Sequence, residues 1–354
     1  MMKKLVILGG GYGGIRIISK LLEAGIPNDV EITLVDRNPY HSLKTEFYTI
    51  AAGTSADKDV RVDFPINSQV KLMYGEIIQI YPDKQQIELR NNKDMISYDY
   101  LVIALGCEDN YHGIEGASQF TESVQSIKKA RHTGYVVNNL DANQKVVIVG
   151  AGLSGIEVAS EIRESRPDLT IQLLDRGSSV LNAFDEKIQD YVADWFEKNN
   201  VEVLHHANVE SVEEGIVYNN GESLETDVII WTAGVRPNHL VRDLPFEKDG
   251  HEKIILNEFY QVPTSENVYV VGDCAASPHS PSAQLARQQG EQIADILTAV
   301  LQDNEPKKPK DIKLKGALGS LGKSDGFGNM YNQPMTGYLP RLAKSGVLWL
   351  NKRH

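Results

Sequence analysis

The chain has 354 residues, a formal net charge of −12 and a hydrophobic fraction of 41%, enough for a large core divided between two or more domains. No apolar run approaches the roughly 20 residues that span a bilayer. Its two cysteines, Cys107 and Cys274, are far apart in sequence. This excludes a C-x-x-C redox disulfide and a Cys/His metal cluster, and it favours a reducing, cytoplasmic compartment.

The first 36 residues are predicted to form a strand, a turn, a helix and a second strand. The turn places Gly9, Gly11 and Gly14 in a G-x-G-x-x-G frame, and the second strand ends at Asp36. Such glycines let the backbone approach a pyrophosphate at a helix N-terminus, and an acid roughly 20 residues later accepts a ribose hydroxyl. The alternative is a glycine-rich turn without a ligand, but the complete strand, helix and acid favour a dinucleotide site.

A second unit of the same kind follows at residues 145–175. It has Gly150, Gly152 and Gly155 in the same frame, and its second strand ends at Asp175. Two such sites in one chain predict electron transfer between two dinucleotides. The Asp175 carboxylate favours NADH over NADPH because it repels a 2′-phosphate, although Arg176 could pair with that phosphate.

Two strand-like strings, LVIALG (101–106) and IIWTAG (229–234), are alike, and VVGDCA (270–275) ends a third strand at Asp273. The sequence here resembles the flavoprotein disulfide reductase superfamily, which binds two dinucleotides. That resemblance implies FAD at the first glycine turn and NADH at the second. The FAD set is Gly9, Gly11, Tyr12, Gly13, Gly14, Asp36, Arg37, Ala104, Gly106, Gly272, Asp273 and Gln284. The NADH set is Gly150, Gly152, Leu153, Ser154, Gly155, Glu157, Asp175, Ala233 and Gly234.

Within that superfamily, AQLARQQG (283–290) and NPYH (38–41) resemble type II NADH dehydrogenases, the single-subunit NADH:quinone oxidoreductases. The resemblance implies a quinone near Gln284 and Gln288, which lie four apart on one helical face. The alternative is that both amides bind loop backbone groups. Glu157 is a candidate for proton handling beside the nicotinamide and flavin, or for stabilising the helix N-terminus. His41 is predicted to be a satisfied core or surface histidine.

The last 49 residues, 306–354, contain ten Lys or Arg and two Asp. On a helical wheel over 339–354, Leu339, Leu342 and Trp349 lie opposite Arg341 and Lys344. This pattern predicts a helix at an anionic membrane interface, and the alternative is a helix packed on the body or on a dimer mate. Nucleic acid is not expected as a partner because the rest of the chain is acidic.

The predicted fold is α/β, with two Rossmann-like domains and a short basic tail. The FAD domain is expected at 1–113 and 247–305, the NADH domain at 114–246 and the tail at 306–354. The predicted enzyme passes hydride from NADH to FAD and then two electrons to a membrane quinone, without proton pumping, at the cytoplasmic face of the membrane. The alternatives are a soluble reductase of a small redox protein such as ferredoxin, and a non-catalytic NADH sensor. The sequence leaves open whether the chain forms a homodimer.

Overall fold

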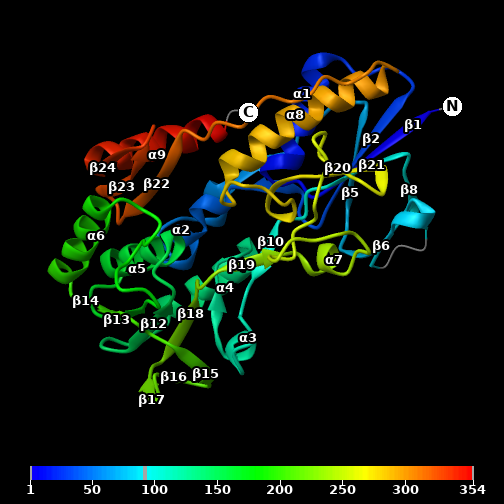
Figure 1. The fold of residues 1–354 in the computed structure, drawn as a ribbon. Helices are drawn as coiled ribbons and strands as arrows, with labels where there is room; N and C mark the ends of the chain where they lie inside the picture. The colour runs from blue at the N-terminus through cyan, green and yellow to red at the C-terminus, as the bar shows by residue number, and fades with distance from the viewer. Residues whose placement is uncertain (1, 91–93, 353–354) are drawn as a thin grey trace. The chain divides into compact units, whose positions relative to one another are not determined.

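The computed structural model describes residues 2–90 and 94–352, and the chain divides into two units built from distant segments (Figure 1). Unit 1 comprises Met1–Ser42, Arg61–Glu108 and Arg236–Leu314, and unit 2 comprises Leu43–Val60, Asp109–Val235 and Lys315–His354. Strands β10 (Cys107–Asp109) and β19 (Val235–Pro237) pair with each other where the chain passes between the units.

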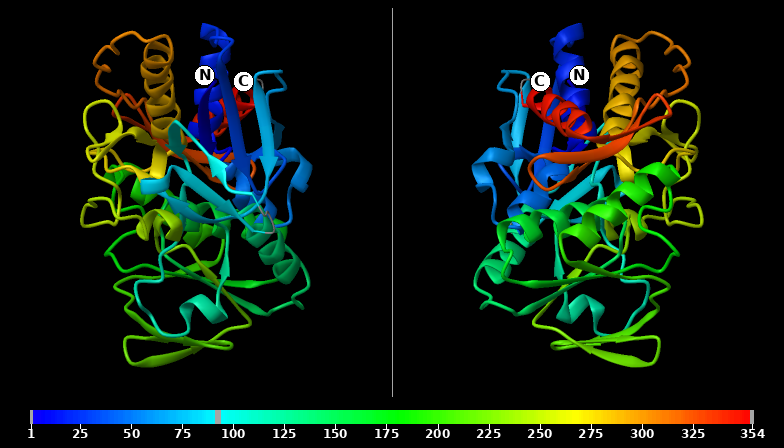
Figure 2. Two further views of the ribbon diagram at one scale, coloured as in Figure 1. Left: turned by 90° about the vertical axis from the view of Figure 1, so that its right-hand side faces the viewer. Right: turned by 90° about the vertical axis from the view of Figure 1, so that its left-hand side faces the viewer.

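Unit 1 is built on a six-stranded sheet in the order β20-β21-β9-β1-β2-β5. All neighbouring strands are parallel except β20, which is antiparallel to β21. The strands are β1 (Lys3–Leu8), β2 (Val30–Asp36), β5 (Val70–Tyr74), β9 (Tyr100–Ile103), β20 (Gln261–Val262) and β21 (Ser265–Val270). Helices α1 (Tyr12–Ala24) and α8 (Ala283–Leu301) lie side by side (Figure 2).

The two faces of this sheet bury different partners because strand side chains alternate. Leu5 and Ile7 pack with α1 and α8, whereas Val6 and Leu8 pack with a second layer. That layer holds β6 (Ile77–Tyr81), β7 (Gln86–Leu89), β8 (Ile96–Ser97) and α7 (His239–Arg242). The remaining strands of unit 1, β3 (Tyr40–Ser42) and β4 (Arg61–Asp63), form an antiparallel pair.

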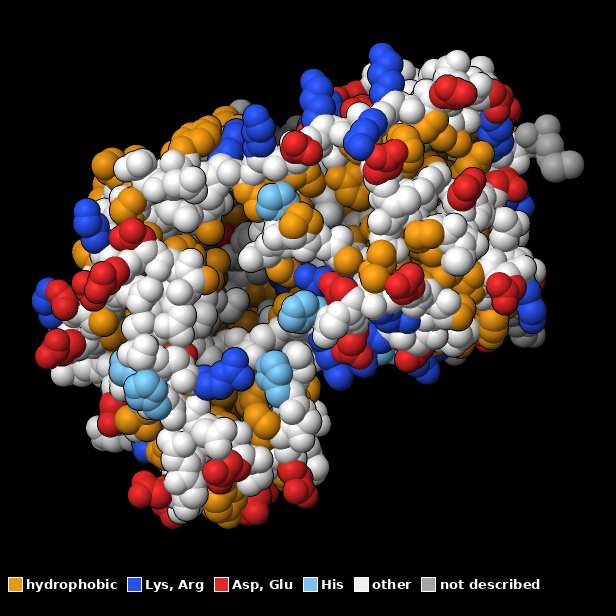
Figure 3. Space-filling view, in the orientation of Figure 1, with side chains coloured by type: hydrophobic (Ala, Val, Ile, Leu, Met, Phe, Trp, Pro, Cys, Tyr) orange, Lys and Arg blue, Asp and Glu red, His pale blue; other side chains and the backbone are white. Residues whose placement is uncertain are grey.

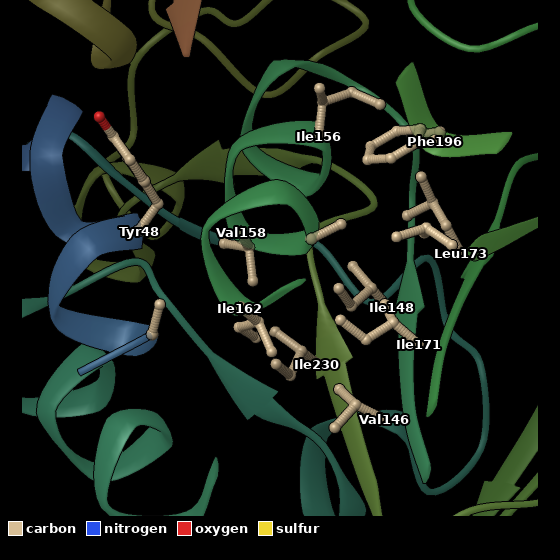
Figure 4. Close-up of a cluster of buried hydrophobic side chains, with 14 of the residues drawn as sticks. Tyr48, Val146, Ile148, Ile156, Val158, Ile162, Ile171, Leu173, Phe196 and Ile230 are labelled. Atoms are coloured by element: carbon tan, nitrogen blue, oxygen red, sulfur yellow. The ribbon is translucent and has the colours of Figure 1, made fainter. Parts of the chain in front are cut away.

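Unit 2 repeats this plan around a parallel five-stranded sheet in the order β11-β18-β12-β13-β14. The strands are β11 (Glu122–Ser123), β12 (Lys145–Val149), β13 (Thr170–Leu174), β14 (Val201–Leu204) and β18 (Val228–Trp231). One face packs against α2 (Phe47–Ala51), α4 (Ile127–Asn138), α5 (Leu153–Ser165) and α6 (Glu186–Lys198), as Figure 4 shows for part of this core. The other face covers α3 (Ala117–Phe120), β15 (Val209–Glu213), β16 (Ile216–Asn219) and β17 (Glu222–Glu225).

The C-terminal region packs into unit 2, which differs from the separate tail expected from the sequence. Strands β22 (Gly316–Leu321), β23 (Asp325–Met330) and β24 (Gln333–Gly337) form an antiparallel sheet, and α9 (Tyr338–Asn351) packs on it. Leu321 and Phe327 are fully buried in the unit 2 core. Their burial explains why residues from 315 onward belong to this unit; positions 353 and 354 of the predicted membrane helix lie outside the described residues.

The other boundaries also differ from the expected 1–113, 114–246 and 247–305. The passages between units fall at residues 108/109 and 235/236, and residues 43–60 join unit 2. Residues 43–60 belong to unit 2 because α2 packs on α4 and α5. The predicted fold class is confirmed, with two Rossmann-like parallel sheets, one inserted between segments of the other.

Candidate dinucleotide sites and a buried charge cluster

The first glycine turn joins β1 to α1, and two of its glycines are required by close packing. A Cβ on Gly9, whose φ is +103°, would lie 2.4 Å from the Ala104 carbonyl oxygen, and one on Gly14 would lie 2.1 Å from the Gly9 oxygen. A Cβ on Gly11 would meet no described atom within 4 Å. The turn therefore packs tightly at Gly9 and Gly14 and leaves space at Gly11, at the N-terminus of α1, where a pyrophosphate would bind.

The second turn, between β12 and α5, has the same geometry. Gly150 has a φ of +106°, and a Cβ on Gly155 would lie 1.9 Å from the Gly150 oxygen. A Cβ on Gly152 would again meet no described atom within 4 Å. Neither Gly11 nor Gly152, the N-cap residues of α1 and α5, has a side-chain cap among the described residues. Both helix N-termini can therefore receive an anion.

The acids that end the second strand of each unit differ in their hydrogen bonds. Asp36 accepts N–H groups from Gly10 and Asn38, each at 2.7 Å, and its burial raises its pKa against the effect of those bonds. Asp175 accepts one N–H group, from Gly177 at 3.2 Å. Its Oδ2 is buried and has no hydrogen-bond partner among the described residues. That oxygen is available for a ribose hydroxyl, as expected for a dinucleotide site.

The similar strings LVIALG (101–106) and IIWTAG (229–234) each end beside the glycine turn of their own unit. The Ala104 N–H donates to the Leu8 oxygen at 2.8 Å, and the Thr232 N–H, just before Ala233, donates to the Val149 oxygen at 2.8 Å. Gly106 and Gly234 both have positive φ. The other predicted contacts vary in exposure: Gly13 is buried, Leu153 is half-buried, and Arg37 and Ser154 are exposed.

The third string, VVGDCA, ends β21 and packs on the AQLARQQG segment of α8. The Gly272 N–H donates to the side-chain Oε1 of Gln289 at 2.8 Å, and Gln289 is buried. Asp273 is half-buried in the same turn. The sequence analysis missed Gln289, although it lies within the string that was singled out.

The two glutamines predicted to face a quinone have different surroundings. Gln288 binds the backbone of Lys313 through both amide atoms, at 3.1 and 3.3 Å, which matches the alternative interpretation for this residue. Gln284 is half-buried in the first turn of α8. Tyr12, the first residue of α1, and His41 of β3 contact each other edge to face, with their ring centroids 4.8 Å apart. His41 is buried with its Nδ1 2.9 Å from the Gly10 oxygen.

A buried cluster of ionisable groups surrounds Glu157 in unit 2. Glu157 and Lys344 form a short ion pair, and Glu157 also accepts the Ser320 N–H at 3.0 Å. The Lys344 ammonium is 3.8 Å from a second carboxylate, Glu46. The Tyr48 hydroxyl lies 3.3 Å from Glu46 and 3.0 Å from the Ser320 hydroxyl. All five residues are buried.

The electrostatics of this cluster follow from burial and from its charge count. Burial raises the pKa of Glu157, an effect that Lys344 opposes and Glu46 reinforces. The two carboxylates raise the pKa of Lys344 against its desolvation, and burial raises that of Tyr48 to about 12. Two carboxylates face one ammonium, so the cluster can hold an additional proton.

The sequence predicted Glu157 but missed Lys344, Glu46 and Tyr48 as its partners. Lys344 was placed on a solvent-facing basic side of the last helix. The structure buries Lys344 and half-buries Leu348, whereas Leu339, Leu342 and Trp349 are exposed. The presence of Leu348 four residues after Lys344 was the available signal that this face packs inward.

The residues present fit FAD and NADH. Each glycine turn leaves an open helix N-terminus, and each unit has an acid at the strand end where a ribose would lie. The orphaned Oδ2 of Asp175 is the clearest of these features because a buried acceptor without a partner is costly.

Known proteins support the same assignment. Residues 3–290 match the pyridine nucleotide-disulphide oxidoreductase family. The chain is 50% identical to the NADH dehydrogenase-like protein YutJ of Bacillus subtilis, over 100% of this chain and 99% of that protein. It is 27% identical to the type II NADH:quinone oxidoreductase of Staphylococcus aureus, over 95% and 91% of the two chains.

Solved structures show the same fold. The NDH2 of Plasmodium falciparum in complex with NADH has a TM-score of 0.84 at 17% identity, covering 99% of this chain and 94% of that one. The sulfide:quinone oxidoreductase of Aquifex aeolicus has a TM-score of 0.81 at 19% identity, covering 99% and 92%. This chain belongs to the pyridine nucleotide-disulphide oxidoreductase family and is an NADH-dependent flavoprotein oxidoreductase of the NADH dehydrogenase-like kind, with FAD and NADH as its cofactors.

Proposed function

We propose that this chain is an NADH:quinone oxidoreductase that works at a membrane surface without pumping protons. The observation that carries the proposal is the bond from Gly272 to Gln289, which packs AQLARQQG directly on the Gly-Asp turn assigned to FAD. The S. aureus relative is named for the same activity. The flavin would accept hydride from NADH and pass on two electrons, which is chemistry that the cofactor itself supplies.

The side chains supply binding and orientation. The N-termini of α1 and α5 would hold the two pyrophosphates, and Asp36 and Asp175 the riboses. Gln284 is proposed to bind a quinone carbonyl through its amide, whereas Gln288 fixes the segment at Lys313. Glu157, with Lys344, is proposed to hold a proton for transfer during turnover.

The test starts with the flavin absorbance of the purified protein. NADH should bleach the flavin, NADPH should do so more weakly, and menadione should restore the colour with repeated turnover. A small [2Fe–2S] ferredoxin serves as the alternative acceptor. Fast reoxidation by ferredoxin together with failure of menadione would refute the quinone proposal, and a flavin that NADH does not bleach would refute both.

The proposed membrane contact is the exposed side of α9. Leu339, Leu342, Val347, Trp349 and Leu350 are each at least half exposed. Figure 3 shows hydrophobic side chains at the upper left, where Figure 1 places α9, with basic side chains beside them. Within the described residues no helix is long and apolar enough to cross a bilayer. An amphipathic helix with neighbouring cations is suited to binding in the interface of an anionic leaflet.

Substituting Leu339, Leu342 and Trp349 together by serine tests this contact without disturbing buried Lys344. Sedimentation with phosphatidylglycerol vesicles should fall sharply, and binding of the unmodified protein should weaken in high salt. Ile66→Ser is the matched control, because Ile66 is 96% exposed in unit 1. Unchanged sedimentation of the triple variant would refute the membrane proposal, and a dimer that dissociates in this variant would assign the face to self-association.

A further inference from the structure

The two cysteines of the chain come together in unit 1, although the sequence separates them widely. Cys107 begins β10, where the chain leaves unit 1, and Cys274 ends the short 3-10 helix η4 (Gly272–Cys274) in the Gly-Asp turn. Cys274 is fully buried and Cys107 is half-buried. Both are thiols in this structure.

A hydrogen bond from sulfur shows how close the two segments are. The Cys274 thiol donates to the Gly106 carbonyl oxygen at 3.2 Å. In a trans peptide that oxygen lies about 2.8 Å from the Cα of the next residue, so the Cα of Cys107 is within about 6 Å of the Cys274 sulfur. Disulfides join Cα atoms about 4.4–6.8 Å apart. The two residues therefore need only a small movement to be bridged.

The two thiols differ in how readily they react. Burial raises the pKa of the Cys274 thiol, and the negative charges of Asp273 and of an ionised Cys107 add to this rise. The thiolate is the reactive form of cysteine, so Cys274 is a poor first nucleophile. Cys107 is the thiol that solvent reaches, and an oxidant therefore meets Cys107 first.

We propose that Cys107 and Cys274 are a modification site for hydroperoxides, which convert the pair into a reversible disulfide. The Cys107 sulfur attacks one oxygen of hydrogen peroxide, the O–O bond breaks, and Cys107 sulfenic acid and water form. The Cys274 sulfur then attacks the sulfenic sulfur, the S–O bond breaks and a second water leaves. Overall, the two thiols lose two electrons and two protons to one peroxide.

The disulfide would join the end of the β9 segment to the Gly-Asp turn that is assigned to FAD. Gly106 and Cys274 are 168 positions apart, and a cross-link that closes a long loop restricts the unfolded chain strongly. Both linked residues belong to unit 1. The oxidised protein should therefore release its flavin at a melting temperature higher by about 5 °C or more.

A purely structural role for Cys274 makes a different prediction. Cys274 belongs to an apolar layer of unit 1 together with Ile254 and Ala275, so its thiol could simply fill space there. In that case peroxide adds oxygen to Cys107 and leaves the Cys274 thiol intact. The mass of the oxidised protein separates the two roles.

The test treats the FAD-loaded protein with hydrogen peroxide, then unfolds it in N-ethylmaleimide and measures its mass. The wild type should lose the mass of two hydrogen atoms, take up no maleimide and yield a linked pair of tryptic peptides that contain Cys107 and Cys274. Dithiothreitol should restore both thiols. Cys107→Ser should keep the Cys274 thiol, and Cys274→Ala should stop at a Cys107 sulfenic acid that dimedone traps.

Flavin fluorescence during heating gives a second readout. Peroxide should raise the melting temperature of the wild type and leave that of Cys107→Ser unchanged, and this half-buried position keeps the test valid where Cys274→Ala folds poorly. Wild-type protein that keeps both thiols, gains oxygen at Cys107 alone or links two copies of the chain would overturn the proposal. A linked pair without a rise in melting temperature would overturn its stabilising effect. None of these outcomes depends on which acceptor the flavin reduces.

Discussion

Replacing Lys344 by methionine should destabilise unit 2 strongly. The substitution keeps most of the side-chain volume, so little cavity energy is expected. It leaves Glu157 buried without its ion-pair partner, and Glu46 loses a cation at 3.8 Å. Removing one member of a buried pair costs about 3–5 kcal/mol. We expect a loss of that size at neutral pH.

The loss of stability in Lys344→Met should grow with pH because the pKa of Glu157 is shifted upward. Burial already raises the pKa of Glu157 above its ordinary value of 4.5, and Lys344 is the largest factor that opposes this rise. Without Lys344 the folded protein retains a proton that the unfolded chain releases. Stability is then greatest below pH 4.5 and falls by about 1.4 kcal/mol per pH unit until the raised folded pKa is reached.

Urea unfolding followed by tryptophan fluorescence measures this loss, because Trp195, Trp231 and Trp349 all belong to unit 2. The double variant Lys344→Met with Glu157→Gln should recover much of the stability, since it removes both charges of the pair. A loss below about 1 kcal/mol, the range of surface pairs, or a double variant no more stable than Lys344→Met alone, would refute the reasoning.

Three further predictions concern the dinucleotide and acceptor sites. Gly152→Ala should keep the melting temperature and raise the NADH KM about 10-fold or more, whereas Gly155→Ala should lower the melting temperature, because its Cβ would lie 1.9 Å from a backbone oxygen. Asp175→Ala should weaken NADH binding by about 10- to 100-fold, the value of a charged hydrogen bond. It should also raise the activity with NADPH relative to NADH in steady-state kinetics. An unchanged preference between the two would contradict the proposed binding of the ribose by Asp175. Gln288→Ala should lower the free energy of unfolding in urea by about 1 kcal/mol with little change in the KM for menadione. Gln284→Ala should raise the KM for menadione. The reverse pattern would contradict the roles assigned to the two glutamines.

The duplicated dinucleotide units could be predicted from sequence because their determinants are local. Gly14 and Gly155 are fixed by the backbone oxygens of Gly9 and Gly150 in their own turns, although Gly9 also packs against the distant Ala104. Each acid lies at the end of a strand that begins soon after the helix. Residue type and spacing therefore carry most of the geometry.

The charge cluster could not be predicted in the same way, because its members come from three distant segments. Glu157 and Lys344 are 187 positions apart. Pattern analysis also assumes that the apolar side of a helix packs and the polar side faces water. Helix α9 reverses this arrangement by burying Lys344 and exposing Leu339 and Leu342. Helix α9 thus has a buried ion pair on one side and exposed apolar side chains on the other. This arrangement agrees with the proposed contact between the apolar side of α9 and a membrane.

The two acids of the duplicated units show how the same motif can serve a retained and an exchanging dinucleotide. One oxygen of Asp36 accepts the Gly10 N–H of the glycine turn and the other accepts the Asn38 N–H of the loop after β2, so the turn is held in shape before any ligand arrives. Asp175 keeps Oδ2 without a partner among the described residues. Preorganisation lowers the entropy cost of binding and suits a cofactor that stays, such as FAD. Asp175 Oδ2 gains its hydrogen bond only from the ligand, and this favours binding. No hydrogen bond within the protein has to change when the ligand leaves. This arrangement suits NADH, because NADH must enter and NAD⁺ must leave in every turnover.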